Sequence, residues 1–469
     1  MSLFSCSLPG YTFSFSRTSE NSSSGSKGNT LSQINPLFEA RYVISNPYEQ
    51  VNWETYGQYK ADFHAHSTNS DGKNTALEML ERYYSAGFSI VAMTDHDYLT
   101  TSLGSGSGSI STKRANEMVS GIGRSGLGMI GMTNSIEQSN TDHINSYFVE
   151  YNNPPDSTMT NTLAAVESLG GITHINHPGR YTGGMAGGLI GTAASNNPLV
   201  IQEYVDLFKV YHSCVGMEIV NKLDDESCCD RILWDNILSK IMPDGRSVWG
   251  FANGDSHGID EIGYSYNIML LPSLSLEETR LAMECGAFYA VSRVSRPDGI
   301  NSILPNGDEM PGSGTSTTLY LLEQPVPGIA CIVIDQRTGS ITISGTDYDR
   351  IEWIADGVVI ATGERLDLNK YNDVTGCYVR AQLKSNTGIA YTQPFGIKEL
   401  LPTVGKTVVK QQFQNALCSL TGYQVAVLGK QSSVRQKMTC IYPLLLQQTP
   451  TALRQPLPTA PSELHKRKT

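Results

Sequence analysis

The chain has 469 residues and a formal net charge of -11 at pH 7. A chain of this length is expected to form two folded domains with additional tails. General nucleic-acid binders and membrane-surface binders need a basic face, so the acidic balance argues against both classes. A small anionic substrate stays possible, because bound cations can reverse the local potential.

The cysteine pattern and the lack of recognisable targeting signals bear on the expected cellular compartment. The nine cysteines are scattered and form no C-x-x-C pair, so reduced thiols are expected and none makes a convincing zinc set. The amino terminus has no basic n-region and serines interrupt its apolar residues, which argues against a signal peptide. No apolar run is long enough for a membrane span. We therefore expect a cytoplasmic protein.

The first part of the chain is expected to precede the main domain. Residues 1–36 are rich in Ser, Gly and Asn without sustained periodicity, which predicts a flexible leader. Aromatic and β-branched residues between positions 37 and 53 favour edge strands or a lid that leads into the next domain.

Two histidines follow the first strand of that domain. Residues 59–63 predict a short strand, and His64 and His66 stand directly after it. Because alternate side chains of a strand point to one side, these two imidazoles can bind one ion.

A second ligand cluster follows the next strand. Residues 74–86 have the apolar spacing of an amphipathic helix that ends at Gly87. Residues 89–93 are a continuous apolar run, typical of a buried parallel strand, and the sequence TDHD at 94–97 follows them. Ligand clusters after neighbouring strands are the arrangement of an α/β enzyme with its site at the carboxyl ends of the strands.

The alternation of strands and helices continues to about residue 289. We expect further strands at 126–132, 144–149, 172–175, 215–220 and 247–252, and further helices at 112–119, 160–169, 201–210, 231–241 and 275–285. Such alternation predicts a parallel α/β barrel. More chemically active residues stand near the strand ends: Glu137, His143, His177, Asp255 and His257.

These side chains have an ordinary and a functional interpretation. A single histidine is more often a solvated turn residue than a ligand. The complete set favours a metal centre, because crowded acidic and imidazole groups repel or titrate unless a cation holds them. Nitrogen and oxygen ligands suit zinc, manganese or iron.

The motifs resemble those of a known family. FHAHSTNSDG followed by VAMTDHD is similar to the first two motifs of the polymerase and histidinol phosphatase (PHP) family of metal-dependent phosphoesterases. The family pattern continues with a glutamate, a histidine soon after it, a histidine before a proline, and a final Asp-x-His. Here these are Glu137, His143, His177, and Asp255 with His257, although Ser135 stands where the family usually has glycine. The resemblance implies a distorted (β/α)7 barrel over residues 37–300.

The resemblance also implies ligand sets for two to three divalent ions (Mn, Zn or Fe). One ion would be held by His64, His66, Glu137 and Asp255. Glu137 would share a second ion with His143 and His177. Asp71, His96 and His257 would hold a third. Asp95 and Asp97 would then orient imidazoles through their ring N–H groups.

The leading functional hypothesis is a metal-dependent hydrolase of phosphoric ester bonds. Such a cluster lowers the pKa of a bound water to roughly 7 and supplies hydroxide for attack on the ester. Arg180 is the candidate cation for the phosphate, and His257 is both a ligand and a catalytic candidate. His174 could protonate the leaving group or pack beside His177. Glu218 is expected at a core edge or as a supporting residue.

The partners expected from this reading are small phosphorylated substrates such as nucleotides or metabolites, with no stable nucleic-acid partner and no membrane. Two alternatives stay open: an amidohydrolase-like hydrolase of C–N bonds, and a non-catalytic metal-binding protein. The first commonly uses a carboxylated lysine bridge, whereas Glu137 stands at the bridging position. The second would be expected to have lost ligands, and this chain keeps all of them.

The pattern changes after the barrel. Residues 312–398 contain short β-rich segments with turn signals, among them Asp356-Gly357, and predict a sandwich-like domain that supports the barrel or binds a partner. Residues 399–469 end Pro-rich and basic, and they predict no fold.

Overall fold

The computed structural model describes residues 40–101, 103, 108–140, 142–179, 193–222, 228–293 and 324–400. The chain divides into two compact units, residues 1–402 and 403–469, and every element below belongs to the first. The predicted leader, Arg180 and the residues beyond 400 lie outside the described residues. None of the described helices combines the length and apolar character that a membrane crossing requires.

The amino-terminal strands form a parallel group with two helical crossovers. β2 (Gly57–Asp62), β3 (Ile90–Val91) and β4 (Ile130–Gly131) pair in parallel, and α1 (Ala76–Ser85) and α2 (Thr112–Val119) connect them. α1 begins at a capping box, in which Thr75 and Glu78 satisfy each other's backbone N–H groups. Met79, Leu80 and Tyr83 bury one face of α1 in the core. This confirms the predicted strand-helix-strand unit.

Two further strands extend this sheet in the opposite direction. β10 (Ser265–Leu271) pairs antiparallel with β2, and β11 (Phe288–Ser292) pairs antiparallel with β10. α8 (Leu276–Cys285) lies between them in the chain and starts at the N-cap Ser275, the first residue of the helix predicted at 275–285.

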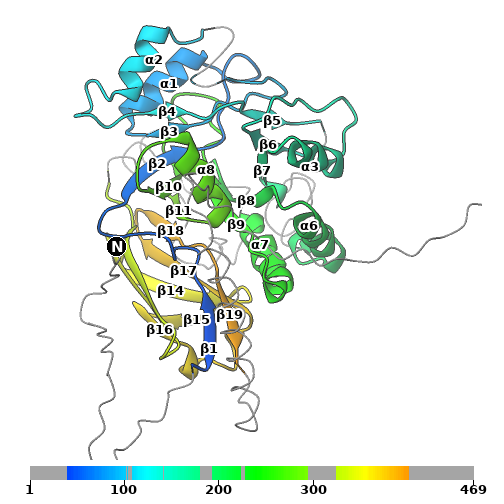
Figure 1. Ribbon diagram of the computed structural model, residues 1–469, viewed down its shortest axis with the longest axis vertical. Helices are drawn as coiled ribbons and strands as arrows, with labels where there is room; N and C mark the ends of the chain where they lie inside the picture. Colours follow the sequence, from blue (N-terminus) through cyan, green and yellow to red (C-terminus); the bar gives the residue numbers. More distant parts are fainter. Residues whose placement is uncertain are drawn as a thin grey trace, which may run out of the picture. The chain divides into compact units, whose positions relative to one another are not determined.

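A second, five-stranded sheet carries the rest of the α/β region. Its order is β5 (Ile136–Gln138), β6 (Ile144–Tyr147), β7 (Ile172–Ile175), β8 (Cys214–Asn221) and β9 (Trp249–Asn253). The helices described between these strands include α3 (Met159–Ser168), α6 (Pro198–Val210) and α7 (Cys228–Ile241), which is followed by η1 (Met242–Asp244). Figure 1 shows these three helices together on one side of the molecule.

The expectation of an all-parallel sheet is wrong for several strands. β5 pairs antiparallel with β6, and β6 with β7, whereas β7, β8 and β9 are parallel. Only residues 139–143 connect β5 to β6, and a parallel pair needs a crossover of a dozen or more residues. The result is a mixed α/β fold with several sheets.

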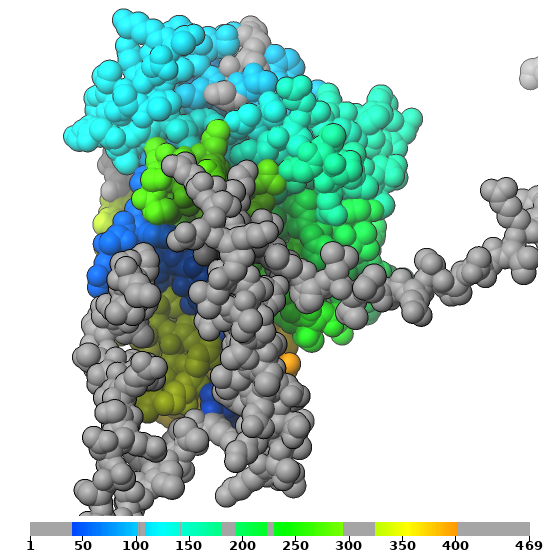
Figure 2. Space-filling model, in the orientation of Figure 1, coloured from blue at the N-terminus to red at the C-terminus, as the bar shows by residue number. Residues whose placement is uncertain are grey.

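The two sheets meet just beyond the carboxyl ends of their strands. Backbone bridges join Ala65 to Ser256 and His96 to Glu137. Beneath these bridges, Phe63 packs edge-to-face on Tyr147 and on Phe251. Figure 2 shows the part with α1 and α2 in direct contact with the part that carries β5, β6 and α3. The residues that follow the strands are thereby brought to one place.

The β-rich region contains two sheets that share a core. One is β12 (Gly328–Asp335), β13 (Ser340–Thr346) and β16 (Arg365–Asp367). The other contains β14 (Arg350–Ala355), β15 (Val358–Thr362), β17 (Tyr378–Ser385), β18 (Gly388–Tyr391), β19 (Phe395–Glu399) and, at its edge, β1 (Tyr42–Ser45). A short 3-10 helix, η2 (Leu368–Lys370), follows β16 in the chain. Ile341 and Ile343 of the first sheet belong to the same core cluster as Trp353 and Leu383 of the second.

The predicted turn at Asp356-Gly357 is confirmed, and it closes a β-hairpin. β14 and β15 pair antiparallel around it, and both turn residues have positive φ, 47° and 73°. Positive φ at both central residues is the requirement of a type I′ turn, which Asp-Gly fulfils.

The β-rich region and the α/β region are joined by continuous pairing and by buried polar contacts. β18 pairs with β11, with Ala290 opposite Tyr391, so one sheet runs through both regions. Arg380 of β17 donates from Nε and Nη2 to the two carboxylate oxygens of Asp235 on α7, each at 2.7 Å. Both side chains are buried, at 0% and 3% exposure.

Replacing Arg380 with methionine should therefore destabilise the whole unit. Breaking a buried ion pair by removing one partner leaves an uncompensated charge, and we expect a loss of about 3–5 kcal/mol in the free energy of unfolding. Chemical denaturation measures it. The matched control is Arg337→Met, which removes a guanidinium that is 69% exposed and 4.0 Å from Asp335, and about 1 kcal/mol or less is expected for such a surface pair. Equal stability of the two variants would contradict the account.

Candidate metal centre

The first two histidines are placed by β2 and by the loop after it. His64 and His66 flank Ala65, whose bridge to Ser256 holds the segment extended, and both imidazoles are fully buried. The loop turns back at Gly72, where a Cβ atom would lie 2.7 Å from the backbone of Ser67. This tight return carries Asp71 over His66.

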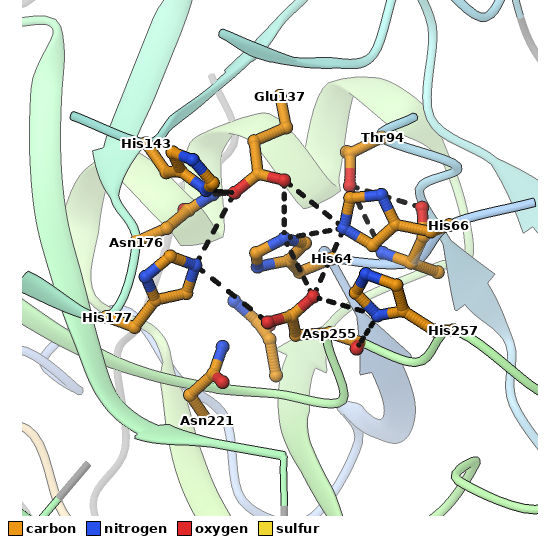
Figure 3. Close-up of polar contacts among 12 residues, drawn as sticks. His64, His66, Thr94, Glu137, His143, Asn176, His177, Asn221, Asp255 and His257 are labelled. Atoms are coloured by element: carbon orange, nitrogen blue, oxygen red, sulfur yellow. Dashed lines mark hydrogen bonds and ion pairs between the residues drawn. The ribbon is translucent and has the colours of Figure 1, made fainter. Parts of the chain in front are cut away.

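Glu137 lies at the centre of the site and is fully buried. Its two oxygens face different histidines, and Figure 3 shows Glu137 and Asp255 on opposite sides of His64. Oε2 of Glu137 lies 3.1 Å from His64 Nε2, 3.2 Å from His66 Nε2 and 3.0 Å from His96 Nδ1. Oε1 lies 2.9 Å from His143 Nδ1 and 3.5 Å from His177 Nε2.

Two aspartates complete the cluster. Oδ1 of Asp255 lies 3.1 Å from His66 Nε2 and 3.4 Å from His64 Nε2, and its Oδ2 lies 3.8 Å from His177 Nε2. At the outer side, Oδ2 of Asp71 lies 3.1 Å from His257 Nε2 and 3.7 Å from His96 Nε2.

All nine ligands predicted from the sequence occur in overlapping groups whose donor atoms lie within 4.8 Å of one another. These groups are His66, Asp71, His96 and His257; His64, His66 and Glu137; His64, His177 and Asp255; and His96, Glu137 and His143. The overlap is that of a multinuclear centre.

The protonation of His64 shows that these residues fit a cation. Its Nδ1 lies 2.8 Å from Glu218 Oε1, which fixes one ring proton there, so a neutral His64 would present a lone pair at Nε2. That lone pair faces Glu137 and Asp255, which are also acceptors. Oε2 of Glu137 and Nδ1 of His96 lie 3.0 Å apart, yet neither makes a hydrogen bond to any described residue. Acceptors that converge in this way need a cation among them.

The pKa values of His64 and Glu137 reflect the same excess of hydrogen-bond acceptors over donors. Burial disfavours a charged His64, yet Glu137, Asp255 and Glu218 together hold its pKa well above the ordinary value. Burial likewise disfavours a charged Glu137, but the surrounding histidines, His64 first, hold its pKa well below the ordinary value. Protons therefore take the positions that ions would take, and metal binding has to displace them.

Supporting residues hold the ligands in place: Glu218 was expected in such a role, whereas Asn176 and Asn253 were not named from the sequence. Glu218 accepts from His64 and from the backbone N–H of His177 at 2.9 Å, and Asn253 Nδ2 donates to it at 2.8 Å. Asn176 Nδ2 donates to Glu137 Oε1 at 2.8 Å. Asn176 and Asn253 each stand within two residues of a ligand at a strand end, which is the signal that could have identified them.

The resemblance implied that Asp95 and Asp97 orient imidazoles, but the structure shows a different role for both. Asp95 Oδ1 accepts from the backbone N–H of Ser67 at 2.6 Å and from Ser70 Oγ at 3.0 Å. Asp97 accepts from the backbone N–H and hydroxyl of Ser139. They organise the loops around the ligands instead of orienting imidazoles, because the neighbouring serines occupy their oxygens.

His174 lies deep in the fold and is fully buried. Its Nε2 is 3.0 Å from the hydroxyl of Tyr147, and its ring stacks on Phe251. Burial lowers the pKa of His174 to about 4, so the ring is neutral at pH 7. His174 thus packs on Tyr147 and Phe251, and its role as a proton donor to the leaving group stays a prediction.

Comparisons with solved structures find neighbours of low sequence identity. No family model and no curated protein matches this chain. A two-domain protein from Bacteroides vulgatus containing a predicted PHP-like metal-dependent phosphoesterase is 14% identical over 75% of this chain and 89% of its own, with a TM-score of 0.36. An amidohydrolase from Chromobacterium violaceum, with bound sulfate and no metal, is 15% identical over 48% of this chain and 96% of its own, with a TM-score of 0.30.

A lesion-specific endonuclease from Pyrococcus furiosus is also similar. It is 15% identical over 49% of this chain and 56% of its own, with a TM-score of 0.30. PHP-like metal-dependent phosphoesterases, whose motifs this chain resembles, are thus among the solved structures similar to it.

Proposed function

We propose that this protein is a metal-dependent phosphoesterase that hydrolyses small phosphorylated substrates, with two to three divalent ions in a distorted barrel of the PHP type. One observation carries the proposal: nine imidazole and carboxylate side chains converge in overlapping groups whose ligand atoms lie within 4.8 Å of one another. The bridges between the two sheets, next to His66 and at His96, support the barrel.

We assign the donor atoms to three sites, following the ligand sets that the resemblance implies. His64, His66, Glu137 and Asp255 would hold the innermost ion, because their facing atoms are 3.1–3.4 Å apart. Glu137 Oε1 with His143 and His177 would hold a second. Asp71, His96 and His257 would hold the outermost. When bound, such ions activate water as a nucleophile at neutral pH and neutralise charge on phosphoryl oxygens.

The exposure of the ligands gives the direction from which a substrate would approach. His64, His66 and Glu137 are fully buried and form the floor. His96, His143 and His257 keep 25%, 19% and 18% of their side chains exposed, and Asp71 keeps 55%. A phosphoryl group would therefore enter over these outer ligands, while Glu218 and Asn176 keep the floor in position. Arg180 stays a proposed phosphate contact.

A substrate screen tests the reaction class. Metal-reconstituted protein is assayed for phosphate release from nucleotides and phosphorylated metabolites, for cleavage of phosphodiesters, and for hydrolysis of amide and cyclic amide substrates. We expect turnover of phosphate esters. Turnover confined to C–N bonds would instead favour the amidohydrolase-like alternative.

A further inference from the structure

Lys222 stands at the end of β8 in a conformation that lysine rarely adopts. Its φ is 48°, and the ligands His177 and Asp255 also have positive φ, 26° and 43°. Non-glycine residues in this region are strained and tend to occur at functional sites, where the surrounding structure holds them. Here the backbone N–H of Lys222 donates to Asn253 O at 3.2 Å, and its carbonyl accepts from Ser265 Oγ at 2.8 Å.

This backbone directs the ammonium group to the edge of the metal centre. Nζ of Lys222 lies 3.4 Å from Oδ2 of Asp255, and the Lys222 side chain is 30% exposed whereas Asp255 is 3% exposed. The other oxygen of Asp255 faces His64 and His66. The lysine is therefore a partly exposed cation beside Oδ2 of Asp255, which also lies 3.8 Å from His177 Nε2, whereas Oδ1 faces the floor of the site.

A simple ion pair with Asp255 does not account for this position in the loaded protein. Once an ion binds Asp255, the carboxylate charge is shared with that ion, and the ammonium then stands beside positive charge. Like charges repel unless an anion lies between them. An ammonium with three rotatable donors on a flexible stem suits a phosphate oxygen in that place.

We propose that Lys222 contacts a non-bridging oxygen of the phosphoryl group of the substrate and holds it against the ions, an inference that rests on the proposed function. Its positive charge would stabilise the negative charge that the phosphoryl oxygens carry in the transition state. The same contact would hold inorganic phosphate, so binding can be measured without turnover.

The test uses Lys222→Met in the full-length, metal-reconstituted protein. Metal content is measured by elemental analysis, and inorganic phosphate binding by calorimetry. Metal content should stay at the wild-type level, the Kd for phosphate should rise at least about 10-fold, and kcat/KM for the best ester should fall by roughly 10²-fold, the scale of removing one preorganised donor. Lys222→Arg should recover part of both losses, because it restores the charge.

Two controls keep the outcome interpretable. Lys222→Asn removes the charge with a residue that tolerates positive φ, so it should fold and reproduce the methionine variant. Lys209→Met removes a surface lysine paired with Asp244 at 2.7 Å and should change neither metal content nor phosphate binding.

Three results would overturn the inference. If Lys222→Met and Lys222→Asn bind phosphate as the wild type does, Lys222 is not a phosphate contact. If both lose metal, Lys222 supports Asp255 instead. If wild-type protein binds metal but neither binds phosphate nor cleaves any ester, the proposed function itself has failed, and this inference fails with it.

Discussion

Replacing Glu137 with glutamine should remove metal and activity together. Both oxygens of this carboxylate face histidines, three on Oε2 and two on Oε1, so it lies between the two proposed inner sites. Glutamine keeps the shape, removes the charge and places an NH₂ donor where a cation has to bind. Because residues that only support ligands already contribute 10–100-fold, loss of this ligand should lower kcat/KM by more than roughly 10²-fold.

Elemental analysis and steady-state kinetics on the same preparation measure the two effects. The matched control is Glu284→Gln, which removes a surface carboxylate paired with Arg280 on α8 and should change neither quantity. A Glu137→Gln protein with full metal content and wild-type turnover would show that Glu137 is not the bridging ligand.

Replacing Glu218 with glutamine should weaken metal binding although Glu218 is not itself a ligand. Burial opposes ionisation of this carboxyl, but the charge and hydrogen bond of His64 lower its pKa to about 2. It therefore stays ionised at neutral pH and keeps the proton of His64 on Nδ1. In the glutamine variant, the new side-chain NH₂ would face either the Nδ1–H of His64 or the NH₂ of Asn253. Two hydrogen-bond donors repel each other, so His64 would lose its orientation.

The expected effect is a 10–100-fold loss of metal affinity, the range found for groups that orient a ligating histidine. A competitive metal titration measures it, and kcat/KM under subsaturating metal should fall in parallel. Glu167→Gln is the control, because this half-buried carboxylate accepts from the backbone of Ser213 and does not contact the centre. Unchanged metal affinity in Glu218→Gln would mean that the orientation of His64 does not depend on this contact.

The helices and most strands of the α/β region were predictable because their signals are local. The cap at Ser275, the apolar face of α1 and the buried runs of β8 and β9 each lie within one segment of sequence. Strand direction was not predictable in the same way. Whether β10 pairs parallel or antiparallel with β2 depends on residues about two hundred positions apart, and no local pattern records that choice.

The residues of the site also differ in how well the sequence predicts them. Ligands could be named because imidazoles and carboxylates at strand ends have a distinctive chemistry and order. Lys222 could not, because a lysine after a strand resembles an ordinary solvated turn until its φ and its distance to Asp255 are known. For Glu218, the sequence showed only an acidic residue within a strand, which left its role open. Its role became clear through His64, a partner 154 residues away.

Metal content per chain, measured with phosphate release on the same sample, tests the central claim most directly. Protein purified without chelators, or reconstituted with manganese, zinc or iron, should contain roughly two or more equivalents of metal, as a bridged cluster requires. It should release phosphate from at least one small ester, lose this activity on chelation and regain it on readdition. Protein that binds no metal after reconstitution with any of the three would contradict the account.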